Sequence, residues 1–263
     1  MSRRRIGITL GDPAGIGPEV VAKALDSGKL DRRFDYEIIR GEPRSALVLA
    51  ANRCLAGELA GMATGPIVKR QVAPWPGQTE FLAHLSGTKR FAMMLCNDQL
   101  RVALVTTHAP LRDVPGLITG KKIVDVVELT RDFCRRLGIR RPRIAVTGLN
   151  PHAGEGGLLG TEERLIIAPA VKRARAIGPC PADTVFYRAL HGEFDAVVAM
   201  YHDQGLAPFK LLAFDNGVNV TLGLPFVRTS PDHGTAPDIA GQGIARPAGM
   251  IAAINLAARL AHR

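Results

Sequence analysis

The chain has 263 residues, enough for one large domain or two small ones at about 150 residues per domain. Charged residues make up 22% of the chain and apolar residues 46%, a globular composition that excludes a disordered chain or a coiled coil. No stretch reaches the roughly 18 apolar residues of a membrane span, and no apolar segment follows the basic start. We therefore expect a cytoplasmic protein that does not contact a membrane.

The net charge is +10, from 34 basic and 24 acidic residues. The basic residues are dispersed and only 5% of residues are aromatic, so the charge shows no nucleic-acid footprint and predicts no nucleic-acid partner. An excess of arginine also suits a small anionic substrate. The cysteines form no C-x-x-C pair and are expected to be buried, reduced thiols: Cys54, Cys96, Cys134 and Cys180.

Strand-like apolar runs alternate with helix-like segments along the chain. Strands are predicted over 5–10, 36–40, 101–107, 143–149 and 195–201. Helices are predicted from Gly17 towards Lys29, once between 41 and 63, from a Thr119 cap to Gly138, from a Thr161 cap through Ile177, and over 249–262. This alternation predicts an α/β fold with a mostly parallel sheet.

Three of the seven histidines share a context. His108, His152 and His202 each follow a predicted buried strand by a few residues. Ligands of an open α/β sheet bind outside the carboxyl ends of its strands, so three imidazoles at that edge could converge. Three His ligands with an open fourth position are typical of a catalytic divalent metal site. The alternative is that each is an ordinary histidine at the start of a loop.

Polar residues after these strands are further candidates. Asp203 directly follows His202 and could orient it, or could simply cap the turn. Lys210, Asn219 and Arg228 lie in one later segment. Lys and Arg beside a metal suit a phosphate or carboxylate, although a solvated charge is the ordinary alternative.

Two other segments carry weaker signals. Residues Gly11–Glu19 lie between a strand and a helix like a phosphate-binding loop, but they lack the G-x-G-x-x-G spacing of the Rossmann fingerprint. His233, in the polar stretch 229–236, could be a fourth imidazole, a cofactor contact or a structural histidine.

Taken together, these motifs resemble those of the 4-hydroxythreonine-4-phosphate dehydrogenase (PdxA) family of vitamin B6 synthesis. The matching strings cover most of the chain in order: GDPAGIGPE at 11–19, TGPIVK at 64–69, PGQTEFLA at 76–83, VALVTTHAPLRDV at 102–114, GLNPHAGEGG at 148–157, MYHDQGLAPFK at 200–210 and GVNVTLGLPFVRTSPDHGTA at 217–236.

The resemblance implies a fold like that of the isocitrate and isopropylmalate dehydrogenases. Two α/β/α domains would flank a cleft, and a homodimer interface would complete the site. A shortened first domain is expected over 1–70 plus 237–263, and the second, with the metal histidines, over 71–236. NAD or NADP would bind without a Rossmann fingerprint, through residues that the motifs do not identify.

The resemblance also implies roles for individual residues. The metal ligands fall on His108, His152 and His202, which would hold a divalent ion such as zinc, cobalt, manganese or magnesium. Substrate-binding positions fall on Thr79, Lys210, Asn219 and Arg228, while Lys210 and Asp203 are the candidate catalytic groups. The metal would stabilise the substrate alkoxide as hydride leaves to the nicotinamide, and the resulting 3-keto acid would lose CO₂.

Two departures from the family pattern keep alternatives open. Gln78 stands where the family usually has histidine, and although it remains a substrate-binding candidate it cannot carry a positive charge. The chain is also some tens of residues short between the first helix and Thr64. The leading prediction is oxidation of 4-hydroxythreonine 4-phosphate. The alternatives are a dehydrogenase of threonate or erythronate 4-phosphate and a non-catalytic shortened relative.

Overall fold

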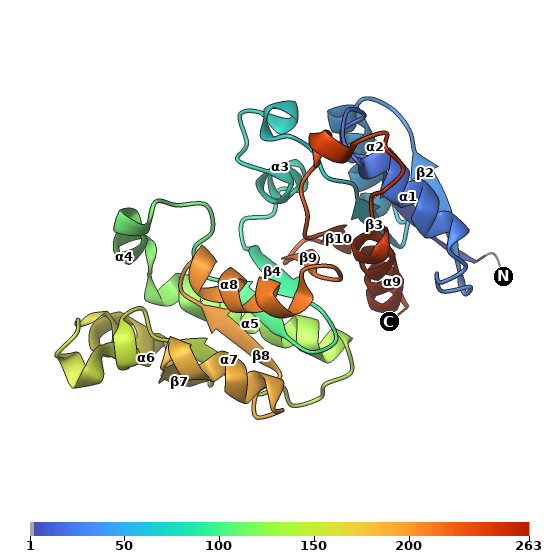
Figure 1. Ribbon diagram of the computed structural model, residues 1–263. Coiled ribbons are helices and arrows are strands. Elements are labelled where there is room, and N and C mark those ends of the chain that lie inside the picture. The colour runs from blue at the N-terminus through green and yellow to red at the C-terminus, as the bar shows by residue number, and fades with distance from the viewer. Residues whose placement is uncertain (1–2, 263) are drawn as a thin grey trace. The chain divides into compact units, whose positions relative to one another are not determined.

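The computed structural model describes residues 3–262, which form two compact units (Figure 1). The first unit comprises the chain up to Lys89 and again from Phe214, and the second comprises Arg90–Ala213. Residues 71–89 and 214–236 therefore belong to the first unit, whereas the motifs suggested a domain change at 70 and 236. No helix in the described part of the chain is long and apolar enough to cross a bilayer.

The first unit contains a five-stranded layer and its covering helices. Its elements are β1 (Arg4–Thr9), α1 (Gly17–Asp26), β2 (Phe34–Ile39), α2 (Pro43–Leu55), β3 (Gly61–Thr64), η1 (Lys69–Val72), α3 (Gln78–Leu85), β9 (Val218–Leu222), β10 (Arg228–Pro231), η5 (Pro237–Ile239) and α9 (Ala248–Ala261).

Its strands run in the order β2-β1-β3-β10-β9. All neighbours are parallel except β9, which is antiparallel to β10. Helices α1 and α9 cover one face, where Val20 and Ile254 pack on Ile8. The order 2-1-3 with right-handed crossovers requires α2 on the opposite face, where its buried residue Leu47 lies.

The second unit is built in the same way. Its elements are β4 (Ala92–Cys96), β5 (Arg101–Leu104), η2 (Leu111–Asp113), α4 (Val114–Leu117), α5 (Gly120–Arg136), β6 (Ile144–Thr147), η3 (Pro151–Gly157), the π-helix η4 (Glu163–Ile167), α6 (Ala168–Arg173), β7 (Ile177–Cys180), α7 (Ala182–Leu190), β8 (Ala196–Ala199) and α8 (His202–Ala213).

Its strands run in the order β4-β5-β8-β6-β7, with only β4 antiparallel to its neighbour. Helices α7 and α8 share one core with the strands, and fully buried Phe209 lies within it. Helix α8 approaches the sheet closely at Gly205, where an added Cβ would lie 2.8 Å from Val102. The crossover rule places α5 and α6 on the other face.

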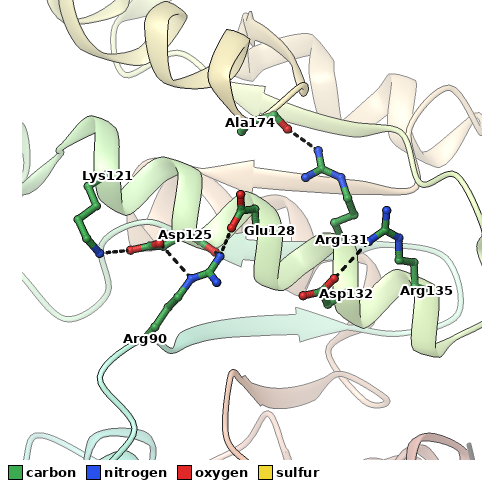
Figure 2. Close-up of polar contacts among 8 residues, drawn as sticks. All are labelled: Arg90, Lys121, Asp125, Glu128, Arg131, Asp132, Arg135 and Ala174. Atoms are coloured by element: carbon green, nitrogen blue, oxygen red, sulfur yellow. Dashed lines mark hydrogen bonds and ion pairs between the residues drawn. The ribbon is translucent and has the colours of Figure 1, made fainter.

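Helix α5 carries a polar network on its exposed side (Figure 2). Arg90, just before β4, pairs with Asp125 and with Glu128. Arg131 donates to the carbonyl oxygen of Ala174 at the end of α6. A cation at this end of a helix also interacts favourably with the negative end of the helix dipole. Exposed ion pairs of this kind contribute at most about 1 kcal/mol each. The contacts link the segment before β4 and the end of α6 to α5.

Most predicted elements are present, and one helix prediction is wrong at its end. The strands and the first, second, third and last helices occur where the sequence placed them, and Thr119 caps α5 by accepting from the N–H of Lys122. Thr161, however, caps no helix, and the helical segment stops at Arg173 because Ile177–Cys180 pairs with β6 as strand β7. All four cysteines are free and buried, as expected.

Candidate active site

The three candidate metal histidines follow three neighbouring parallel strands of the second unit. His108 follows β5, His202 follows β8 and His152 follows β6, and β8 lies between the other two strands. Because these strands are parallel, their carboxyl ends lie at one edge of the sheet. The local alternation of buried strands and loops thus brings the three loops to the same edge.

Two of the imidazoles lie next to each other. The ring centroids of His108 and His202 are 5.5 Å apart, with the ring planes at 43°. Two imidazoles that share one tetrahedral zinc ion have ring centres separated by about 5 Å, so this pair fits a single ion. The Nδ1 atom of His202 lies 2.6 Å from Oδ1 of Asp203, an arrangement that orients the ring and leaves its other nitrogen available to a metal ion.

His152 does not join this pair in the single chain. Its side chain is 65% exposed, and its Nδ1 lies 2.7 Å from Oε2 of Glu155. Among residues 3–262, no three His, Cys, Asp or Glu side chains come close enough together to hold a metal ion. His108 and His202 are therefore close enough to be two candidate ligands of one divalent ion, and the third predicted ligand, His152, stands apart from them.

A single glutamine connects the strand ends beneath these histidines. The Oε1 atom of Gln204 accepts from the hydroxyl of Thr147 and from the N–H of Met200, both at 2.7 Å. Its Nε2 donates to the carbonyl oxygen of Gly148 at 2.8 Å. Gln204 therefore links the end of β6 to the start of α8. It holds the segments that lead to the candidate ligands His152 and His202 in fixed positions relative to each other. Apart from its place beside Asp203, no sequence signal predicted this role of Gln204.

In the first unit, the predicted substrate-binding residues gather around Arg228 on β10. Its side chain is 3% exposed. Its Nη2 donates to Oγ1 of Thr64 at 2.8 Å and to Oε1 of Gln78 at 3.1 Å. Its Nη1 donates to the hydroxyls of Thr221 at 3.1 Å and Thr79 at 3.5 Å. Strand pairing explains this cluster, because β10 lies between β3, which ends at Thr64, and β9, which carries Thr221.

All of these acceptors are neutral oxygens, so hydrogen bonds satisfy the guanidinium while its charge stays largely uncompensated. Burial lowers the pKa of Arg228 to about 10, against the opposing attraction of the Glu80 carboxylate. A buried cation held by neutral groups is stabilised by an anion, and a guanidinium binds carboxylate and phosphate oxygens through paired hydrogen bonds. The arrangement therefore has the chemistry of an anion-binding site, and it is a candidate for binding an anionic group of a substrate.

The other predicted binding residues stand in three situations. Gln78 bridges the cluster to the main chain, because its Nε2 also donates to the carbonyl oxygen of Gly65 at 3.0 Å. Asn219 lies on β9, and its buried Oδ1 has no hydrogen-bond partner, so it is free to accept from a ligand. Lys210 is half-buried on α8 in the second unit.

Comparisons with known proteins agree with this geometry. The family model described as pyridoxal phosphate biosynthetic protein PdxA matches residues 44–257. A 4-hydroxythreonine-4-phosphate dehydrogenase of Geobacter metallireducens is 43% identical over 99% of this chain and 96% of its own length. A D-threonate 4-phosphate dehydrogenase of Pectobacterium atrosepticum is 40% identical over 97% of this chain and 99% of its own.

The chain belongs to the PdxA family. The crystal structure of 4-hydroxythreonine-4-phosphate dehydrogenase from Klebsiella pneumoniae matches 99% of both chains, with a TM-score of 0.86 and 38% identity. Isocitrate dehydrogenase from Methylococcus capsulatus, at 17% identity and a TM-score of 0.55, shares the fold alone. Both confirm the predicted α/β fold class.

This PdxA family member is a short one. Its alignment with the Geobacter relative runs over 326 positions, whereas the chain has 263 residues, so tens of the relative's residues have no counterpart here. Between α1 and β3 the chain contains only β2 and α2. The parallel layer is nevertheless continuous, because β1 pairs with both β2 and β3.

One of the two weaker sequence signals receives a packing explanation, and the other, His233, keeps its open alternatives. The glycines of 11–19 allow close main-chain contact: an added Cβ at Gly17 would lie 2.0 Å from the carbonyl oxygen of Leu10, and one at Gly15 would lie 2.7 Å from that of Thr235. The ring of His233, in the first unit, has Nδ1 3.0 Å from the carbonyl oxygen of Gly234 and a buried Nε2 without a hydrogen-bond partner.

Sequence reasoning overlooked three residues around Arg228. Thr64 and Thr221 end up beside Arg228, and the Glu80 carboxylate opposes the lowering of its pKa. The available signal was a polar residue within a short apolar strand. A buried hydroxyl there needs a hydrogen-bond partner, which for these two threonines is the guanidinium.

Proposed function

We propose that this PdxA family member is a metal-dependent dehydrogenase of a four-carbon hydroxy acid 4-phosphate, with 4-hydroxythreonine 4-phosphate as the leading substrate and oxidation followed by decarboxylation. The observation that carries the proposal is Arg228, a fully buried cation whose hydrogen-bond acceptors are all neutral. Such a site exists to bind an anion, and both relatives described above are named for substrates with a 4-phosphate.

Four residues of the chain bind the anionic and polar groups of the substrate, and a fifth, Gln78, positions Arg228. Arg228 binds the phosphate or carboxylate of the substrate, with Asn219 and Thr79 as further polar contacts. Lys210 supplies a second cation for an anionic group. Gln78 holds the guanidinium in place through its contact with Gly65.

At the histidine edge of the second unit, His108 and His202 hold a divalent metal, and Asp203 keeps the His202 ring oriented. When bound, the metal would lower the pKa of the substrate hydroxyl, and NAD or NADP would accept the hydride. His152 enters the metal site when two copies assemble into a homodimer. Its exposure in the single chain supports this step, because an exposed imidazole is available to a second copy.

The choice of substrate depends on Gln78. The neutral amide of Gln78 beside Arg228 adds no charge to the anion site, whereas a histidine there would add a titratable positive charge. This difference favours testing D-threonate 4-phosphate and erythronate 4-phosphate beside the leading substrate. The four free, buried cysteines agree with action in the reducing cytoplasm, where we place the enzyme.

The test measures absorbance of the reduced nicotinamide. Purified protein is incubated with zinc, cobalt, manganese or magnesium, with NAD or NADP, and with each of the three 4-phosphates. Turnover of one substrate, lost in His202→Ala and in Arg228→Met, supports the proposal. Metal binding without turnover of any of them would refute catalysis and favour a non-catalytic relative. Light scattering of the same sample measures whether the chain is a dimer.

A further inference from the structure

Residues 152–156 form a left-handed turn. All five have positive φ values, between 44° and 83°, and three of them are not glycine: His152, Ala153 and Glu155. Left-handed backbone costs free energy for every residue with a Cβ, so a run of this length persists only where its surroundings hold it. The turn places positions 152 and 155 one above the other, and the His152–Glu155 contact follows from it.

The surroundings that hold the turn converge on one buried carboxylate. Glu163 is 5% exposed. Its Oε1 accepts the main-chain N–H groups of Leu149 and Asn150, both at 2.8 Å. Its Oε2 accepts from Nδ2 of Asn150 at 3.0 Å. Three hydrogen bonds therefore fasten the segment just before the turn to a single side chain.

Packing also places the carboxylate directly against the turn. An added Cβ at Gly154 would lie 2.6 Å from Oε2 of Glu163, and one at Gly148 would lie 2.7 Å from Cα of Ala153. Glu163 begins the π-helix η4, a local widening of the helix that is frequent at functional sites. The glycines of this motif are thus needed for close contact with the carboxylate and within the loop.

The carboxylate is held in its charged form. Burial by itself raises the pKa of Glu163, but the hydrogen bonds from Asn150 and Leu149 together outweigh burial and leave the pKa below its ordinary value. A charged acceptor forms stronger hydrogen bonds to main-chain N–H groups than a neutral one does. An amide in its place would turn an N–H₂ group towards donors.

We propose that Glu163 is a positioning residue that holds the left-handed turn and thereby fixes His152 for metal binding. The proposal rests on the proposed function only in taking His152 as a metal ligand. Glu163 acts through its hydrogen bonds to Leu149 and Asn150 and is not itself one of the proposed metal or substrate contacts. Removing it should change the site without removing any ligand.

Glu163→Gln is the main variant, because it keeps the shape of the side chain and replaces one acceptor with a donor. Asn150→Ala is a milder second variant: it removes the side-chain hydrogen bonds to Glu163 and Glu162 but keeps both main-chain N–H groups that Glu163 accepts. Asp195→Asn is the matched control. Asp195 also accepts a main-chain N–H, from Arg143 at 2.7 Å, but it precedes β8 and so lies at the opposite edge of the sheet.

The first readout is the affinity for Co²⁺ alone, followed by the cobalt absorption bands. We expect Glu163→Gln to weaken Co²⁺ binding ten- to 100-fold, the range typical of groups that orient metal ligands. Asn150→Ala should weaken it less, and Asp195→Asn should leave it unchanged. Combined with His152→Ala, Glu163→Gln should add no further loss, because both act through the same imidazole. Additive losses would overturn the proposal.

The second readout is amide hydrogen exchange over residues 149–157 in the metal-free full-length protein. Exchange there should become faster in Glu163→Gln and stay unchanged in Asp195→Asn. If the wild-type chain binds no Co²⁺, the proposed metal function fails. The rate of amide hydrogen exchange over residues 149–157 is then the test of whether Glu163 holds the turn. Unchanged exchange in Glu163→Gln would overturn the positioning role in either case.

Discussion

Replacing Arg228 with methionine should separate stability from binding. Methionine has a similar length and no charge, so it fills the space of the buried side chain without the guanidinium. Arg228 has only neutral hydrogen-bond acceptors around it. Its charge therefore destabilises the folded protein when the site is empty and favours the binding of an anion.

The magnitude follows from the pKa. Burial lowers the pKa of Arg228 from 12.5 to about 10, which corresponds to roughly 3 kcal/mol against the charged form in the empty site. The variant relieves that penalty but gives up the hydrogen bonds from the guanidinium to four neutral side chains, at about 1 kcal/mol each. The two effects nearly cancel, so the free energy of unfolding should stay within about 1 kcal/mol of that of the wild type.

Ligand binding should respond in the opposite direction. A bound phosphate or carboxylate compensates the guanidinium charge, and losing an interaction of roughly 3 kcal/mol weakens binding by about 100-fold. Calorimetric titration with each 4-phosphate measures the affinity, and urea unfolding measures the stability. Arg5→Met is the matched control in the same unit, because Arg5 forms a half-exposed ion pair with Glu37 and should change neither result appreciably.

Two results would refute the reasoning. If Arg228→Met unfolds several kcal/mol more easily than the wild type, the guanidinium is a structural group that stabilises the empty fold. If the variant keeps the stability and also the affinity for every 4-phosphate, the anion binds elsewhere. The single tryptophan, Trp75, is close in sequence to Gln78 and Thr79, so its fluorescence offers an independent binding signal.

Three further predictions concern other residues. Thr119→Ala should lower the free energy of unfolding by about 1 kcal/mol, because it removes the cap to Lys122 N–H, whereas Thr119→Ser should restore it; equal stabilities in urea would contradict the cap. The side-chain hydrogen bond from Arg33 lowers the pKa of Asp31 from 3.8 to about 2, so its stabilising effect is complete above pH 3.8 and disappears as the pH falls through 2. Urea midpoints of Asp31→Asn should therefore lie below those of the wild type at pH 6 and match them at pH 2, and a gap independent of pH would be the wrong result. Gln78→His should raise kcat/KM for 4-hydroxythreonine 4-phosphate; no change, or a fall, would mean that the pocket is adapted to glutamine and another substrate.

The elements that the sequence predicted well depend on local chemistry. Alternating or continuous apolar runs specify strands such as Ile144–Thr147, and a threonine cap with an apolar face specifies the helix Gly120–Arg136. The placement of His108 and His202 after parallel strands follows from the same patterns, since the carboxyl ends of parallel strands share an edge. Family motifs then indicated the chemistry of that edge.

The helix predicted through Ile177 shows where local patterns end. Residues 163–173 are helical, but Ile177–Cys180 pairs with β6, and a strand pairing formed with a distant segment outweighs a helical tendency. The boundaries of the two compact units also differ from the predicted domain boundaries, because compactness depends on contacts between segments far apart in sequence.

By itself, the sequence determined the α/β class, the family and the residue types of the site, because these reside in short motifs and local periodicity. Only the tertiary structure decided that Arg228 is buried among neutral oxygens, since Thr64 reaches it from 164 positions away through strand pairing. It also decided that Glu163 supports the left-handed turn of His152, because hydrogen bonds and close packing depend on geometry that a string of residues does not contain.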